Sequence, residues 1–158
     1  MGLGPILVYP CGFFDGASAK SGGIGFILHL NDTHSFEFAV GVGQCTNTKE
    51  ELVGLWALLH ITQMMGIPNL RVFDDSSFII NWAKGNAALS PPELHYWCRE
   101  TRKPFSHFLE LSFSHIYREH NQLTDRLSKS ALSLAPGMCT FHEFFDDLLI
   151  TQDTLKLI

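Results

Sequence analysis

Residues 46–73 read TNTKEELVGLWALLHITQMMGIPNLRVF, and this stretch decides the fold. Its apolar residues recur at the spacing of a helix face, namely Leu52, Leu55, Trp56, Leu59 and Met64. Thr48 and Glu51 form a capping-box pattern at the helix start, and Gly66 stops the helix. The segment 69–73 then reads as a buried strand. Because a helix precedes it, we expect this strand to pair in parallel within a mixed sheet.

The rest of the chain extends this pattern on both sides. Strands are predicted at 13–17, 24–30, 34–43, 69–73 and 111–117, and helices at 46–66, 76–85, 90–110 and 120–135. Pro104 should kink or split the third helix, and in the last helix Leu123, Leu127 and Leu132 should point inward. The order β-β-β-α-β-α-α-β-α predicts an α/β fold with a five-stranded mixed sheet, three antiparallel strands then two parallel, flanked by helices. We assign residues 1–134 to this domain and leave 135–158 as a C-terminal extension whose structure stays open.

Composition limits the possible classes of protein. A chain of 158 residues with 46% apolar residues suits a single domain with a core. We expect no membrane span and no signal peptide, because no apolar run is long enough and no basic segment precedes the N-terminal apolar stretch. Four widely spaced cysteines favour reduced core residues of an intracellular protein. The net charge of −5, taken alone, argues against nucleic acid as a partner.

Acidic residues fall at the ends of the predicted elements. Asp15 ends the first strand, Glu51 lies in the first helical turn, Asp74 and Asp75 end the fourth strand, and Asp125 lies early in the last helix. In open α/β sheets, sites lie beyond strand ends. Carboxylates gathered there repel one another unless cations or raised pKa values offset the charge, and oxygen ligands suit Mg²⁺.

Each of these acids also has an ordinary structural interpretation. Asp15 with Gly16 could mark a turn, and Glu51 could only complete the capping box with Thr48. Asp75 could cap the helix that follows, and Asp125 could interact with a helix dipole. The functional interpretation therefore depends on the set and its order along the chain.

Four segments together carry a resemblance to a known family: FFDGASAKSGGIGFIL, TNTKEEL, VFDDSSFI and REHNQLTDRLSKSAL. They resemble the type 1 ribonuclease H family over about residues 10–134, and most closely the ribonuclease H domains of plant non-LTR retrotransposon polyproteins. The resemblance implies an RNase H-like fold. It also implies catalytic, metal-binding residues at Asp15, Glu51, Asp75 and Asp125.

The resemblance further implies a metal-dependent endonuclease that hydrolyses the RNA strand of RNA/DNA hybrids. Asp15 would bridge two Mg²⁺ ions, for which Mn²⁺ can substitute. Glu51 and Asp75 would hold the ion near the leaving 3′ oxygen, and Asp125 the ion that activates the attacking water. Substrate contacts would come from Gly16, Thr46, Asn47, Thr48, Ser76 and Ser77, with Thr46 at a DNA phosphate and the others near the RNA 2′-OH groups.

Three departures from the family pattern stand out. Thr124 replaces the usual alanine before Asp125, Asp74 stands where threonine is common, and Ser77 stands where glutamine is common. His120 is a better candidate than His115, which lies inside a strand, for the family's mobile histidine, but a histidine at a helix start is more often only solvated.

The resemblance also bears on partners and location. Setting the four site acids aside, 16 minus 4 leaves 12 acidic residues against 11 basic ones, so the surface is near neutral. We therefore expect weak, salt-dependent affinity for a hybrid, and neighbouring polyprotein domains that supply much of the binding. The expected location is intracellular and nuclear, during retrotransposon reverse transcription. The alternative is a non-catalytic RNase H-fold module that binds nucleic acid or another partner.

Overall fold

The structure is a computed structural model that describes residues 4–158. The strands are β1 (Cys11–Ser18), β2 (Gly22–His29), β3 (His34–Gly43), β4 (Asn69–Asp74), β5 (Glu110–His115), β6 (Met138–Phe145) and β7 (Leu148–Lys156). The α-helices are α1 (Asn47–Met64), α2 (Ser77–Ala83), α3 (His95–Arg102) and α4 (Gln122–Ser130). Short 3-10 turns are η1 (Pro92–Leu94), η2 (Lys103–His107), η3 (Arg118–His120) and η4 (Ala131–Ser133). Within the described residues, no helix is both long and apolar enough to cross a bilayer.

The strands form one mixed sheet in the order β5-β4-β1-β2-β3-β6-β7. β1, β4 and β5 run parallel, whereas β1-β2-β3 and β3-β6-β7 are antiparallel. The predicted mixed α/β fold is confirmed for its first five strands. The strand count is wrong, because the sheet has seven strands and not five.

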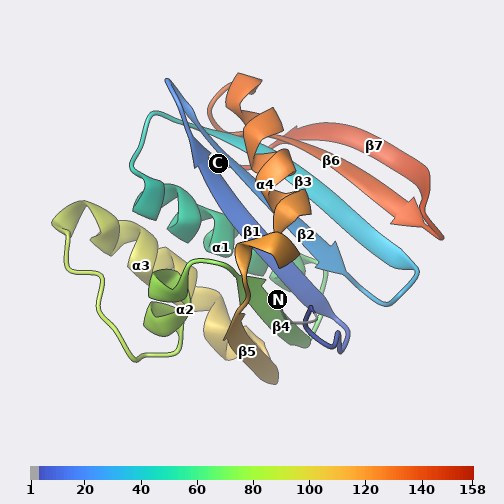
Figure 1. Cartoon of the computed structure of the whole chain (residues 1–158), viewed down its shortest axis with the longest axis horizontal. Helices are drawn as coiled ribbons and strands as arrows, with labels where there is room; N and C mark the ends of the chain where they lie inside the picture. The colour runs from blue at the N-terminus through green and yellow to red at the C-terminus, as the bar shows by residue number, and fades with distance from the viewer. Residues whose placement is uncertain (1–3) are drawn as a thin grey trace.

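The two added strands come from the C-terminal segment, whose structure the sequence left open. β6 pairs along β3, and Cys139 and Phe141 of β6 pack against the main core. β7 pairs with β6 and forms the outer edge of the sheet, where its side chains are almost all exposed. Figure 1 shows this hairpin (red) continuing the sheet beyond β3. Residues 138–156 therefore extend the same sheet.

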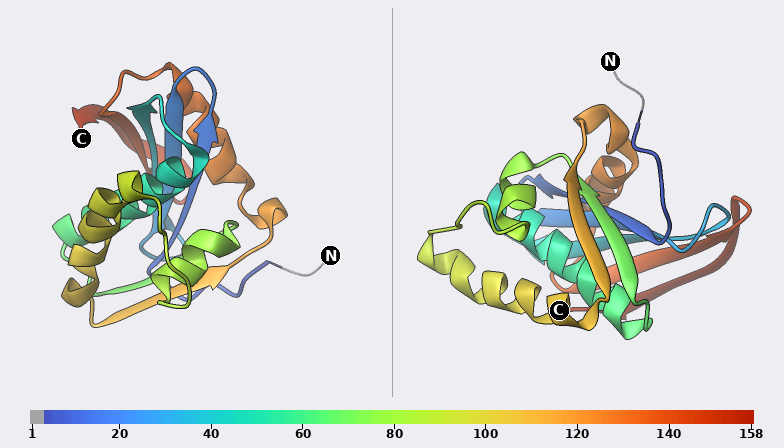
Figure 2. Two further views of the ribbon diagram at one scale, coloured as in Figure 1. Left: turned by 90° about the vertical axis from the view of Figure 1, so that its left-hand side faces the viewer. Right: turned by 90° about the horizontal axis from the view of Figure 1, so that it is seen from below.

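Helices cover both faces of the sheet, with α1 and α3 on one side and α4 on the other (Figure 2). α1 is buried on more than one side because α3 packs against it, and Trp56 meets Trp97 edge to face across this contact. Its buried residues include Leu52, Leu55 and Leu58. The predicted third helix is divided into η1, α3 and η2, and Pro104 lies in η2, as its missing N–H requires.

α4 lies very close to the sheet, and this contact corrects the predicted inward face. The buried residues of this segment are small or polar: Thr124, Ser128 and Ala131. Leu123 is 37% exposed, so its predicted inward direction is wrong, whereas Leu127 and Leu132 are half-buried. The reason is Gly25 of β2, where a Cβ atom would lie 2.6 Å from the backbone of Thr124 and Ser128. The Cβ atom of Leu127 lies equally close to this position, so α4 rests on the strand through its backbone and the base of Leu127.

Candidate active site

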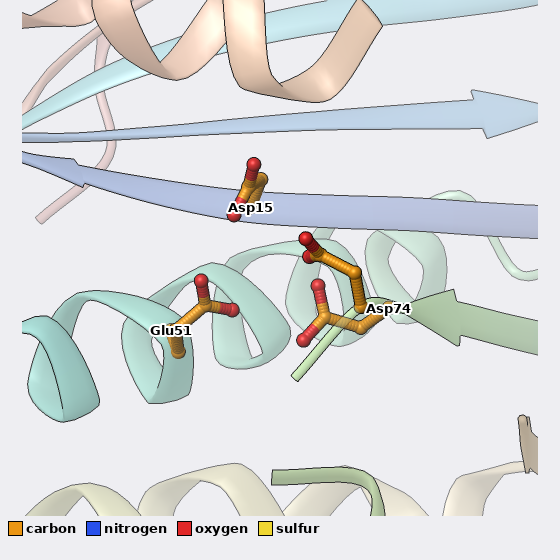
Figure 3. A group of neighbouring side chains, drawn as sticks. Asp15, Glu51 and Asp74 are labelled. Carbon is orange, nitrogen blue, oxygen red and sulfur yellow. The ribbon is translucent and has the colours of Figure 1, made fainter. Parts of the chain in front are cut away.

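Three elements bring carboxylates together at one end of the parallel strands. Asp15 lies on β1, Glu51 on the first turns of α1, and Asp74 and Asp75 at the end of β4. Oxygen atoms from all four side chains lie within 4.8 Å of one another. Figure 3 shows Asp15, Glu51 and Asp74 converging from their three elements. The predicted grouping of Asp15, Glu51 and Asp75 is therefore present in the fold.

Glu51 takes no part in capping α1, so its side chain can face this site. α1 begins at Asn47, and its N-cap is Thr46, whose hydroxyl oxygen accepts the Lys49 N–H at 3.2 Å. The predicted capping box of Thr48 with Glu51 is therefore wrong. Instead, Glu51 Oε1 accepts the backbone N–H of Gly16 at 3.3 Å, on the strand that carries Asp15. The turn interpretation of Asp15 fails as well, because Gly16 pairs with Ile24 inside the β1-β2 ladder.

The two adjacent aspartates have different surroundings. Asp74 has no exposed surface, and its Oδ2 accepts the Ser76 N–H at 3.1 Å. Asp75 Oδ2 lies 3.4 Å from Nε of Arg118, and the N-cap of α2 is Ser76 rather than Asp75. The helix-cap interpretation of Asp75 is therefore wrong. Asp74, which the sequence did not place among the ligands, stands inside the carboxylate group.

Asp125 stands apart from this group and faces the same cleft. The cleft has a volume of about 680 Å³, and its lining includes Asp15, Glu51, Asp75 and Asp125. Asp125 is absent from the four-carboxylate group and pairs with Lys129 of its own helix at 2.9 Å. The structure thus places three predicted ligands together and the fourth on another wall of one cleft.

Burial is the main influence on these acids. It raises the pKa of Asp15, with a further contribution from the negative charge of Asp75. It raises the pKa of Glu51 and of Asp74 well above their ordinary values, and each is raised further by a neighbouring acid. The ionised forms of these groups are therefore costly in the metal-free protein.

The donor set fits divalent cations. All the donors are carboxylate oxygens, the ligands that Mg²⁺ prefers. Glu51 Oε2 is buried and has no hydrogen-bond partner within residues 4–158. An oxygen without a partner beside three other carboxylates is the arrangement that a bound cation would satisfy.

The predicted substrate residues divide into two sets. Gly16, Asn47, Thr48 and Ser76 line the cleft. Thr46 instead caps α1, Ser77 opens α2, and neither is part of the cleft lining. His120 also lies elsewhere, since it lines a separate cavity of about 130 Å³ with His29 and Leu123.

Sequence reasoning did not identify several cleft residues. Phe78 and the two cations Arg118 and Lys129 line the cleft. The spacing of Asp125 and Lys129, one helical turn apart, was a signal for their pairing. The arginine lies 43 residues from Asp75 in the chain, and no local pattern connects the two.

Comparison with known proteins agrees with this geometry. Residues 13–131 match the model of a family described as reverse transcriptase-like. A protein of Arabidopsis thaliana, named as a candidate ribonuclease H protein, is 27% identical over 147 residues, which cover 89% of this chain and 24% of that protein. The chain thus spans about a quarter of the length of this curated relative.

Two solved structures share the fold. RNase H1 from Halobacterium salinarum superposes with a TM-score of 0.73 and 26% identity, over 79% of this chain and 98% of that one. LC11-RNase H1, solved in complex with an RNA/DNA hybrid, has a TM-score of 0.68 and 24% identity, over 77% and 95% of the two chains. The match over most of the chain, the RNase H-like fold and the acidic cleft agree with one another: the chain belongs to the reverse transcriptase-like family of ribonuclease H-like domains.

Proposed function

We propose that the protein hydrolyses the RNA strand of RNA/DNA hybrids and uses divalent cations held by Asp15, Glu51, Asp75 and Asp125. The observation that carries this proposal is the group of buried and half-buried carboxylates within 4.8 Å of one another, at a cleft that Asp125 also lines. The hybrid bound to the related LC11-RNase H1 supports the choice of substrate.

The side chains would act by holding and orienting charge. Asp15, Glu51 and Asp75 form one wall, and the unpartnered Glu51 Oε2 supplies a free donor there. Asp125 would supply the donor on the opposite wall once Lys129 swings away from it. Two divalent cations bound between these walls would stabilise the attacking and leaving oxygens of an in-line displacement. Such a site needs no protein side chain as general base.

Recognition of RNA would come from the polar rim of the cleft. Gly16, Asn47, Thr48 and Ser76 line it beside the carboxylates, where they can reach 2′-OH groups of a bound RNA strand. We retain Thr46 as a candidate for contacting a DNA phosphate, and Ser77 as a candidate next to the RNA. Their positions at the helix starts of α1 and α2 favour contacts to anionic oxygens.

We also propose that this activity serves reverse transcription of a retroelement, in the nucleus, beside further domains of a longer protein. The family description and the fourfold greater length of the Arabidopsis relative support this context. The net charge of −5 supports it as well, since an acidic domain needs help to hold a polyanion. Hybrid affinity, measured at one salt concentration with and without an attached reverse transcriptase domain, tests this context and should rise when that domain is present.

Cleavage of a labelled RNA/DNA hybrid tests the activity. The 158-residue chain should cut the RNA strand in Mg²⁺ or Mn²⁺ and leave duplex DNA and duplex RNA intact. Asp75→Asn should lower the rate by a factor of about 10² to 10³, since loss of one charge-stabilising group costs this much in other active sites. Asp153→Asn, an exposed aspartate of β7, is the matched control and should cut like wild type. An inactive wild type that still binds the hybrid would favour the non-catalytic module instead.

A further inference from the structure

Asn121 occupies an unusual position at the start of α4. It is the N-cap residue of that helix and is 2% exposed, yet its side chain makes no capping hydrogen bond. Asparagine at this position ordinarily accepts a backbone N–H of the first turn. Here the side chain is directed at the sheet instead.

The Asn121 amide joins two of the strands that carry carboxylates. Its Nδ2 donates to the carbonyl oxygen of Phe14 at 2.9 Å, and Phe14 directly precedes Asp15. The same nitrogen donates to Asp75 Oδ1 at 3.1 Å and lies 3.4 Å from Asp74 Oδ1. The residue's own backbone oxygen accepts the Asp125 N–H at 3.2 Å. One buried residue is therefore bonded to both walls of the cleft.

Thr124 determines which way this amide points. Its hydroxyl lies 2.5 Å from Asn121 Oδ1, to which it donates, and 2.9 Å from the Asn121 backbone oxygen, which is a second acceptor for the same proton. A flipped amide would turn its oxygen toward the Phe14 carbonyl and two carboxylates, all of which are acceptors. No backbone N–H at the start of α4 donates to Asn121 Oδ1, and the Thr124 hydroxyl takes that place as the donor. Thr124 is fully enclosed, so water does not compete for this bond.

We propose that Asn121, oriented by Thr124, is a positioning residue that sets the Asp75 carboxylate and fixes the distance from the Asp15–Glu51–Asp75 wall to Asp125. This inference rests on the proposed metal-dependent function. Asp125 lies outside the four-carboxylate group, so its usefulness as a ligand depends on the spacing between walls. The residues that hydrogen-bond to ligands commonly control metal affinity in this way.

Asn121→Ser separates positioning from folding. Serine is a good N-cap and should keep α4 folded, but its side chain is too short to reach Phe14 and Asp75. We expect Mn²⁺ binding, measured by loss of the free-ion electron paramagnetic resonance signal, to weaken by about 10- to 100-fold. In hybrid cleavage, the Mn²⁺ needed for half-maximal rate should rise by a similar factor, while KM for the hybrid stays within about twofold of wild type.

Thr124 supplies the second test. Thr124→Val should weaken Mn²⁺ binding by about tenfold, near the lower end of the range for such partners, and Thr124→Ser should restore it. Thr62→Val is the matched control, because Thr62 is also fully buried with its hydroxyl bonded inside a helix, to Leu58, far along α1 from the cleft. It loses the same kind of bond and should keep wild-type affinity.

The outcomes separate the two proposals. In one outcome, wild type binds Mn²⁺ and cuts the hybrid, and the Mn²⁺ affinities of Asn121→Ser and Thr124→Val stay within twofold of wild type. This outcome overturns the positioning role but leaves the metal-dependent function in place. Equal losses in Thr124→Val and Thr62→Val also overturn it, since the effect would then be general destabilisation. If wild type neither binds Mn²⁺ nor cuts hybrid, the metal-dependent function itself is wrong.

Discussion

Replacing Asp74 by asparagine should stabilise the metal-free protein, although it removes a buried group of native structure. Asp74 has no exposed surface, and its carboxylate lies within 4.8 Å of ligand atoms from three other acids. At an effective dielectric constant of 20, two unit charges at that separation repel by about 3.5 kcal/mol. The neutral amide has nearly the same shape and removes this repulsion, but its NH2 group replaces one of the two oxygens that face the Ser76 N–H and Asn121 Nδ2.

Proton binding limits how large the gain can be. Burial and neighbouring acids raise the pKa of Asp74 well above its ordinary value, so its ionised form is costly in the metal-free fold. If Asp74 is protonated instead, folding takes up a proton, which costs about 1.4 kcal/mol for each pH unit above the unfolded pKa of about 3.9, or about 4 kcal/mol at pH 7. Loss of one accepted hydrogen bond offsets about 1 kcal/mol of the relieved repulsion, so we expect Asp74→Asn to raise the free energy of unfolding near neutral pH by roughly 2 to 3 kcal/mol. For a chain of this size, that is a rise of about 5 to 10 °C in Tm.

Thermal unfolding in the presence of a chelator measures this gain. Circular dichroism of wild type and Asp74→Asn, each with chelator and with excess Mg²⁺, gives four melting curves. The variant should melt higher in chelator, and Mg²⁺ should stabilise it less than it stabilises wild type. Asp153→Asn is the control, because that exposed aspartate should change stability by no more than about 0.5 kcal/mol. A metal-free Tm for Asp74→Asn at or below that of wild type would refute the electrostatic reasoning.

Three further outcomes follow from particular contacts. In chelator, the Tm should fall as pH rises from about 4. Glu51 and Asp74 have raised pKa values in the folded protein, so they contribute most to stability when they are protonated. Bound Mg²⁺ should remove this dependence of Tm on pH. Gly25→Ala should lower the free energy of unfolding in urea by about 1 to 3 kcal/mol and should slow hybrid cleavage, because the added Cβ would push α4 away from the sheet. An unchanged urea midpoint would contradict the close packing. Thr46→Ala should lower the free energy of unfolding by about 1 kcal/mol through the lost cap of α1, and Thr46→Ser should recover it.

Periodicity and element order predicted the central part of the fold. Helical spacing in residues 46–66 and the buried run 69–73 were sufficient for α1, β4 and their parallel crossover, because these depend on local pattern and chain order. The C-terminal hairpin escaped prediction for a physical reason. β7 is exposed on both faces, so its sequence carries no alternation, and its position depends on backbone pairing with β6.

The site shows the same division between local and long-range information. Asp15, Glu51 and Asp75 could be found because each belongs to or directly follows an element whose place in the fold follows from topology, although Asp15 lies within β1 and not at its end. The part played by Asn121 could not be found. An asparagine before a helix indicates a cap, and only the folded chain shows that its amide leaves the helix and bonds to β1 and β4 instead.

Two of the three departures from the family pattern, Asp74 and Thr124, meet at this same amide. An additional buried acid at position 74 adds repulsion and offers Asn121 a second acceptor, 3.4 Å away, that competes with Asp75. A hydroxyl at position 124 holds the amide from its other end and keeps both N–H groups directed at β1 and the aspartates. Because a buried, hydrogen-bonded network costs most when one member is left unsatisfied, the two substitutions make structural sense together. The acid increases the need for a well-oriented amide, and the threonine provides that orientation.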